Sequence, residues 1–150
     1  MAVHASKKET QVSIAIVVAM VLFGSIFFFW APAPEQLMAG SQDGLVQVTG
    51  LARGESDLTV ERLQGVQIDV EGVLGPAYEL SLTDGRLEQG EIKVFIDESV
   101  DITEVVLYQF NRDTLTWTQL ATGFDLTSGS VSAVIEFYGS TLVVAASRVL

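Results

Sequence analysis

A run of nineteen uncharged, mostly apolar residues, Val12 to Trp30, constrains this chain more than any other feature. A helix of that length spans roughly 28 Å, close to the ~30 Å hydrocarbon core of a bilayer. A cleavable secretory signal has a shorter apolar region of about 7–15 residues, followed by a small-x-small site. Ala-Pro-Ala at 31–33 fits such a site, but Pro34 directly after it makes a poor protease substrate. We therefore expect a retained transmembrane helix over residues 12–31.

The charges on either side of this segment predict its orientation. Lys7 and Lys8 precede it, and no Lys or Arg follows until Arg53. Because basic residues are retained on the cytoplasmic side, we expect residues 1–11 to form a cytoplasmic tail. The remainder would then be periplasmic or extracellular, tethered to the cytoplasmic (inner) membrane, with the lipid bilayer as its first partner.

Small and aromatic residues give the expected helix two features. Small residues four apart let membrane helices approach closely, and aromatic rings favour the membrane–water interface. We expect the rings to anchor the helix at the outer interface; packing against a neighbouring helix, lipid or pigment is the alternative. The residues concerned are Ala15, Ala19, Gly24, Phe27, Phe28, Phe29 and Trp30.

After the apolar segment, the chain alternates apolar and polar residues with a period of two. Two prolines end the helix, so residues 32–43 are expected to form a Pro/Gly linker and residues 44–150 a separate domain. Period-two alternation between turn residues predicts half-buried strands. Nine segments fit: 45–49, 57–63, 66–70, 78–82, 91–97, 104–110, 115–120, 131–137 and 141–147. They predict an all-β domain, an antiparallel β-sandwich of about nine strands, with a small closed barrel as the alternative.

The last third of the chain carries a resemblance. "VVLYQF", "LTWTQL" and "VSAVIEFYGSTLVVAAS" follow one another with short turns between them. This succession resembles the final hairpins of immunoglobulin-like modules on prokaryotic surfaces. The resemblance implies an immunoglobulin-like sandwich and carries no catalytic residue.

Charge and composition exclude several functions. The formal charge is −11, and the part beyond Trp30 holds six basic and eighteen acidic residues, a net −12. Such a domain is repelled by phosphate backbones, so we expect no nucleic-acid partner. The chain has no Cys, and its only His, His4, lies in the expected cytoplasmic tail. Thiolate and His-ligated metal sites and Ser-His-Asp triads are thereby excluded from the domain, and we expect neither enzymatic activity nor a cofactor.

One acidic cluster is a candidate cation site. Asp97, Glu98 and Asp101 lie in "IDESVDITE", which ends at Glu104. Calcium needs several oxygen atoms converging in one loop. The spacing matches no known calcium loop, so we interpret these carboxylates as solvated turn residues, with calcium binding as the alternative.

Aromatic residues offer the remaining candidate site. In "EVVLYQF" one face would carry Val106, Tyr108 and Phe110, and the other also looks apolar, which indicates a central strand or one covered by a partner. We expect Trp117 in the core, and we consider Tyr108 and Phe110 candidates for docking a partner.

These features lead to three hypotheses. The first is a non-enzymatic, single-pass accessory subunit whose outer sandwich docks onto a larger membrane-protein complex, such as a respiratory or photosynthetic assembly. The second is a cell-envelope or filament component, because an apolar helix before a sandwich is similar in layout to pilin-like proteins and archaeal motor-anchoring subunits. The third is a calcium- or carbohydrate-binding surface module.

Overall fold

The computed structural model describes residues 33–148, which form β-strands and one 3-10 turn. The strands are β1 (Pro34–Gly40), β2 (Val46–Arg53), β3 (Leu58–Arg62), β4 (Tyr78–Phe95), β5 (Val105–Asn111), β6 (Thr116–Gln119), β7 (Thr122–Asp125) and β8 (Ser130–Ser147), and the turn η1 (Ile102–Glu104) precedes β5. Within these residues no helix could span a bilayer. The expected tail 1–11, the expected helix 12–31 and its residues Ala15, Ala19, Gly24 and Phe27 to Trp30 lie outside the described residues.

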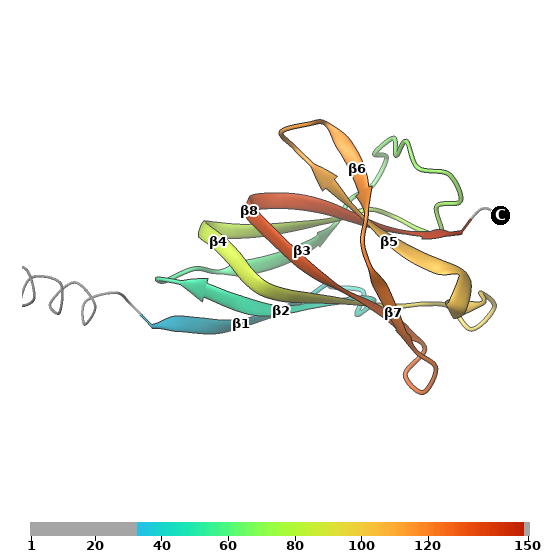
Figure 1. Ribbon diagram of the computed structural model, residues 1–150, viewed down its shortest axis with the longest axis horizontal. Coiled ribbons are helices and arrows are strands. Elements are labelled where there is room, and N and C mark those ends of the chain that lie inside the picture. Colours follow the sequence, from blue (N-terminus) through green and yellow to red (C-terminus); the bar gives the residue numbers. More distant parts are fainter. Residues whose placement is uncertain (1–32, 149–150) are drawn as a thin grey trace, which may run out of the picture. The chain divides into compact units, whose positions relative to one another are not determined.

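The sheet is built on two long strands. β4 and β8, 18 residues each, pair antiparallel along most of their length. The hydrogen-bonded order is β1-β2-β4-β8-β5-β6, while β3 pairs with the first part of β4 and β7 with the first part of β8 (Figure 1). One half of the domain therefore comprises β1, β2 and β7 with one end of each long strand. The other half comprises β3, β5 and β6 with the opposite ends.

Both long strands are bent in the middle. Ser81 pairs with Ser140 and Arg86 pairs with Tyr138. The chain therefore advances five residues along β4 but only two along β8. Gly85 and Gly139 have positive φ angles there (81° and 64°), a conformation that glycine adopts without strain. A second irregularity is a one-residue bulge at Glu88–Gly90, where β4 carries one residue more than both β2 and β8. Bulges of this kind bend a strand and increase its twist.

The bend folds the two halves over one hydrophobic core. Period-two burial is clear in β2, where Val46, Val48, Gly50 and Ala52 are buried and the residues that alternate with them are more exposed. The largest fully buried side chains come from both halves of the domain: Leu80, Leu87, Ile92, Leu107 and Ile135. The prediction of an all-β, antiparallel, sandwich-like fold is confirmed.

The strand inventory differs from the sequence prediction. The segments 78–82 and 91–97 belong to the single strand β4, apart from residues 96 and 97, and the segments 131–137 and 141–147 belong to β8. Glycines between them, which we interpreted as turns, are instead accommodated by bends inside continuous strands. The two separate sheets of an immunoglobulin-type sandwich are thus replaced by one network in which two strands run through both halves.

The predicted strand at 66–70 is wrong. This stretch has no regular secondary structure and belongs to the long connection from β3 to β4. β4 begins at Tyr78, which pairs with Val143 of β8. Beyond that pair, the same edge of β8 bonds to a later part of the connection, since Leu74 N–H donates to the Ala145 carbonyl and Ser147 N–H donates to the Gly72 carbonyl. The alternation at 66–70 therefore finds no strand partner.

The predicted linker over 32–43 is also wrong in most of its length, because Pro34–Gly40 forms β1 and pairs with β2. The proline stands at the first position of an edge strand, where no ladder donor is needed. Leu37 and Ala39 are half-buried and pack against the core, while Met38 between them is 76% exposed. Because Leu37, Met38 and Ala39 are all apolar, the alternation of burial along β1 is not visible in the sequence.

Candidate functional site

The candidate docking residues Tyr108 and Phe110 lie half-buried on β5 and share one side with Trp117 of β6. Phe110 is the cross-strand partner of Trp117, and their ring centroids are 5.2 Å apart at an interplanar angle of 56°. The Tyr108 hydroxyl donates to Gln119 Oε1 at 3.5 Å. Trp117 is half-buried and stands outside the main core cluster, so its predicted core position is wrong. We call Tyr108, Phe110 and Trp117 the aromatic face.

The two apolar faces of β5 are explained by its position in the sheet. Val105 and Leu107 belong to the core cluster, and Val106, only 2% exposed, points to the opposite side. On that side the register places Val106 beside Ala146, and both are buried. The first half of β5 is therefore a central strand covered by the chain's own residues; the aromatic face lies in its second half, where burial decreases.

A groove of about 660 Å³ lies beside the bend of β8. β7 pairs with β8 only up to Ala133, and β5 pairs with the same edge only from Val143 onward. Among the described residues, no strand pairs with residues 134–142 of β8 on this edge. The walls of the opening are the β5–β6 hairpin and the bend itself. We call this opening, with Gln109, Asn111, Thr118, Tyr138 and Ser140 in its lining, the β8 groove.

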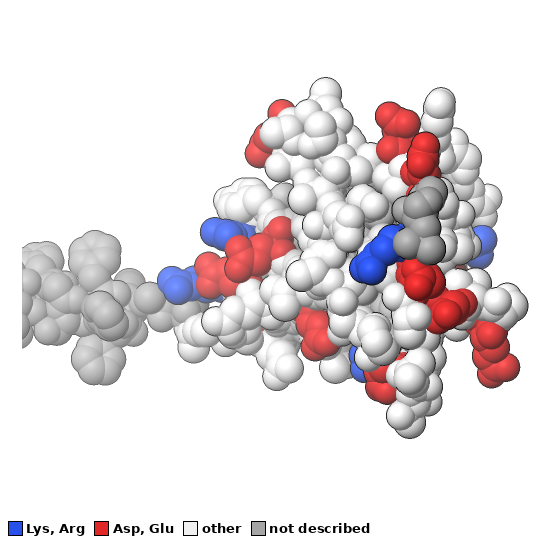
Figure 2. Space-filling view, turned by 45° about the vertical axis from the view of Figure 1, so that its right-hand side comes forward, with Lys and Arg blue, Asp and Glu red and all other residues white. Residues whose placement is uncertain are grey.

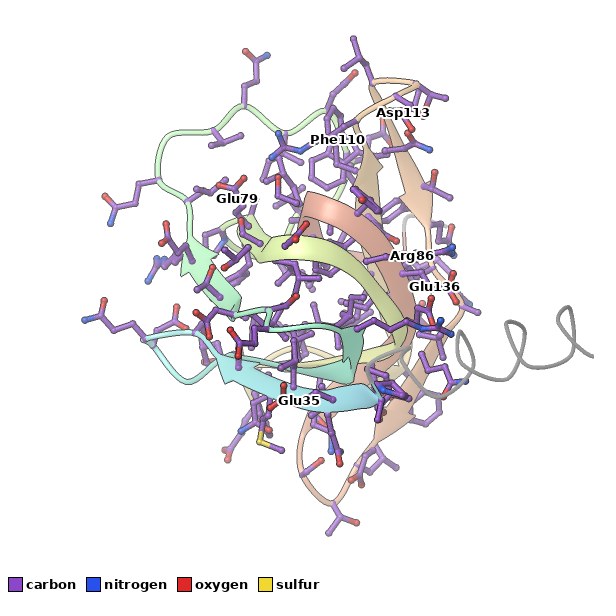
Figure 3. All side chains as sticks on the ribbon, turned by 90° about the vertical axis from the view of Figure 1, so that its left-hand side faces the viewer. Glu35, Glu79, Arg86, Phe110, Asp113 and Glu136 are labelled. Carbon is purple, nitrogen blue, oxygen red and sulfur yellow. The ribbon has the colours of Figure 1, made fainter. Side chains whose placement is uncertain are left out.

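Polar groups and ion pairs line and flank the β8 groove. Arg112 Nη2 lies 2.7 Å from Glu79 Oε1, and Arg86 pairs with Glu136. Figure 3 shows Phe110 and Asp113 together on the hairpin, and Arg86 beside Glu136 on the two long strands. The Gln109 side chain reaches across the groove, where its Nε2 donates to the Glu136 carbonyl at 3.0 Å. Tyr138 is 75% exposed.

A second cavity, of about 260 Å³, has a mostly apolar lining, which also includes Tyr78, Phe95 and Asp97. Leu45 and Leu74 are partly exposed, and Ile92, Val94 and Val143 are among the other side chains that line it. Its composition offers apolar contact and no convergent polar groups.

The candidate calcium residues do not converge. Asp97 Oδ1 accepts from Ser99 N–H, and Asp101 Oδ1 accepts from Thr103 N–H and Oγ1. The Ser99 hydroxyl and N–H lower the pKa of Asp97, and the Thr103 hydroxyl and N–H lower the pKa of Asp101. Each carboxylate is therefore bound within its own turn. Glu98, between them, is exposed. Residues 33–148 contain no group of three or more acidic side chains arranged to hold a metal ion, so the geometry does not support the calcium alternative.

A buried tyrosine joins the start of β4 to the connection between β1 and β2. The Tyr78 hydroxyl donates to Asp43 Oδ2 at 2.9 Å, while Asp43 Oδ1 accepts from Ser41 Oγ and Leu45 N–H. Burial and the bond to Asp43 raise the pKa of Tyr78 to about 12. For Asp43, partial burial raises the pKa, but the hydrogen bonds and the Arg62 guanidinium outweigh it and hold that pKa below its usual value.

Replacing Tyr78 with phenylalanine is expected to flatten the alkaline part of the stability profile. The folded state holds the phenolic proton more tightly than the unfolded state. Its contribution is therefore complete below pH 10 and is lost as the pH rises from about 10 to about 12. Urea denaturation of the full chain in detergent should show the wild type losing about 2 kcal/mol more than Tyr78→Phe across that interval.

Tyr138→Phe is the matched control for this experiment, because the Tyr138 ring is 75% exposed. It should keep the wild-type profile. Parallel profiles for the wild type and Tyr78→Phe would contradict the role given to the Tyr78–Asp43 bond.

Sequence reasoning identified Tyr108 and Phe110 of the aromatic face, assigned Trp117 to the core, and missed the β8 groove. The groove depends on where β5 and β7 stop pairing with one continuous strand, and the sequence divides that strand at Gly139. The one available signal was a surface aromatic beside a glycine, in Tyr138-Gly139.

Comparison of the chain with protein-family models, with curated proteins and with solved structures gives no significant match.

Proposed function

We propose that this chain is a non-enzymatic, single-pass membrane subunit whose β-domain docks onto a larger membrane-protein assembly through the aromatic face. In this proposal residues 12–31 span the cytoplasmic membrane with the N-terminus inside, and the β-domain lies outside. Its partners are the bilayer and other membrane subunits.

The observation that carries the proposal is the unprotected edge beside the aromatic face. Four strands pair with a single neighbour, and three of them carry features that discourage docking. β1 begins with Pro34 and Glu35, β3 ends in Glu61 and Arg62, and β7 contains Gly123 and Asp125. Proline, charge and short length are the usual protections of an exposed edge.

β6 is also short, with four residues, but it lacks the other two protections. Its sequence, Thr116-Trp117-Thr118-Gln119, contains neither a charge nor a proline. Thr and Trp also favour extended structure. The strand places Trp117 beside Phe110 and Tyr108, and aromatic side chains of this kind are enriched at interfaces. An edge open to pairing and a neighbouring aromatic surface together favour a protein partner.

The charge distribution and the lack of His and Cys support a binding role for the domain. Figure 2 shows acidic side chains spread over one face of the domain and few basic ones among them. The absence of His and Cys from residues 33–148 removes the commonest acid–base and nucleophilic groups, which supports a binding role.

The test is co-purification of the full chain from its native membrane in mild detergent. The wild type should migrate with the assembly, and the double variant Tyr108→Ser/Trp117→Ser should migrate alone. The matched control is Leu115→Ser/Phe124→Ser, which removes apolar side chains that are 74% and 54% exposed outside the aromatic face. A wild-type chain that migrates alone would contradict the proposal.

A further inference from the structure

We infer that the β8 groove binds an extended, neutral-to-basic peptide segment, which pairs with the main chain of β8 at its bend and completes the interrupted sheet. The inference deepens the proposed function and rests on it, because the segment would belong to the docking partner.

The main chain of β8 presents hydrogen-bonding groups to the groove. In an antiparallel strand, the N–H and C=O of alternate residues point to the same neighbour. Ala145 and Ser147 bond to the 72–74 segment, on the β4 side. The main chains of Ser140, Tyr138 and Glu136, which have the opposite parity, therefore point to the β5 side. The bond from Gln109 Nε2 to the Glu136 carbonyl agrees with this direction.

Gln109 already supplies one of the bonds that a neighbouring strand would make. Its side-chain amide donates to the Glu136 carbonyl, and Gln109 is the last residue of β5 that pairs with β8. No backbone donor from another strand reaches residues 134–142 on this edge within the described part of the chain. A strand edge that is open in the middle of a sheet selects an extended backbone, as in recognition by β-strand addition.

The size and walls of the groove fit a short segment. Its volume of about 660 Å³ falls within the range of about 300–1,000 Å³ found for ligand sites. The hairpin side offers Thr118 and Asn111, and the strand side offers the exposed ring of Tyr138. Alternate side chains of a bound strand would contact these two walls, as the period of two requires.

The charges favour a neutral or basic segment. Arg112 is paired with Glu79, and Glu136 with Arg86, which leaves Asp113 as the lining charge without an ion pair among the described residues. The part of the chain beyond Trp30 carries a net −12, so an acidic peptide or a second copy of this domain would be repelled.

The test selects decapeptides from a random display library on the full-length chain in detergent and measures their binding by fluorescence anisotropy. Selected sequences should alternate apolar residues with Lys or Arg, and their affinity should fall with added salt. Thr118→Trp, which fills the groove, should weaken them at least tenfold. Thr59→Trp, an exposed position on the edge strand β3 that does not line the groove, should leave them unchanged.

Three results would overturn the inference. The first is that no decapeptide is enriched, and the second is that both tryptophan variants bind the decapeptides equally well. The third is that NMR resonances of the groove residues shift on addition of maltotetraose or cellotetraose but with no decapeptide. The proposed function can fail separately. Co-purification without decapeptide binding leaves the assembly role intact and removes the groove. Decapeptide binding by a chain that migrates alone would support the groove and contradict the assembly role.

Discussion

Gly90→Ala is expected to destabilise the domain by about 3 kcal/mol, the upper part of the range for overpacking a core. A Cβ at this buried position would lie 2.7 Å from the Ile135 carbonyl oxygen and 2.7 Å from Leu87 Cδ2. The first contact is with backbone, so no side-chain rotation relieves it. Relief requires β4 and β8 to separate at the bulge.

Urea unfolding of the full chain, followed by far-ultraviolet circular dichroism, measures this loss. The control is Gly75→Ala, whose Cβ would meet no atom within 4 Å and whose φ lies outside the left-handed region. It should leave stability unchanged or raise it by up to about 1 kcal/mol, because alanine restricts the unfolded chain. Equal midpoints for the two variants would show that the close approach at Gly90 is not required.

The sequence predicted the class of fold because burial alternates with a period of two in most strands. Val46, Val48 and Ala52 show the pattern in β2, and Val131, Ala133 and Ile135 show it in β8. A residue's preference for one face of a sheet is local, so it can be recognised without knowing the partner strand.

Continuity of the strands could not be predicted from the same pattern. Gly85, Gly90 and Gly139 mark turns in most sequences, whereas here Gly85 and Gly139 adopt left-handed conformations inside strands and Gly90 permits a close backbone approach. Whether a glycine ends a strand or bends it depends on tertiary contacts. The β8 groove follows from these bends.

The candidate site was predicted in part. Tyr108 and Phe110 were identified by their position on a strand with two apolar faces, and the structure places both at the half-buried end of that strand. The position of Trp117 was missed because β6 is an edge strand, which leaves the outer side of its hairpin uncovered. Edge position is a property of the whole sheet and cannot be read from four residues.

Leu87→Ala should cost about 3 kcal/mol, since it removes a fully buried side chain and leaves a cavity at the bulge. Leu87 occupies the space beside two glycines, one on β2 and one on its own strand. A Cβ at Gly50 would lie 2.8 Å from Leu87 Cδ1 and 2.9 Å from its Cγ, so Gly50→Ala alone should cost about 2 kcal/mol.

The double variant Gly50→Ala/Leu87→Ala is expected to lose about 1–2 kcal/mol less than the sum of the two single losses. The methyl at position 50 enters the space that Leu87 vacates, and of its close contacts only the one with Gly90 Cα, at 3.0 Å, remains. The matched comparison is Gly90→Ala/Leu87→Ala, where the contact with the Ile135 carbonyl remains after the leucine is removed. Its coupling should therefore be smaller. Additive losses in the Gly50 pair would contradict the close packing of Leu87 against the two glycines.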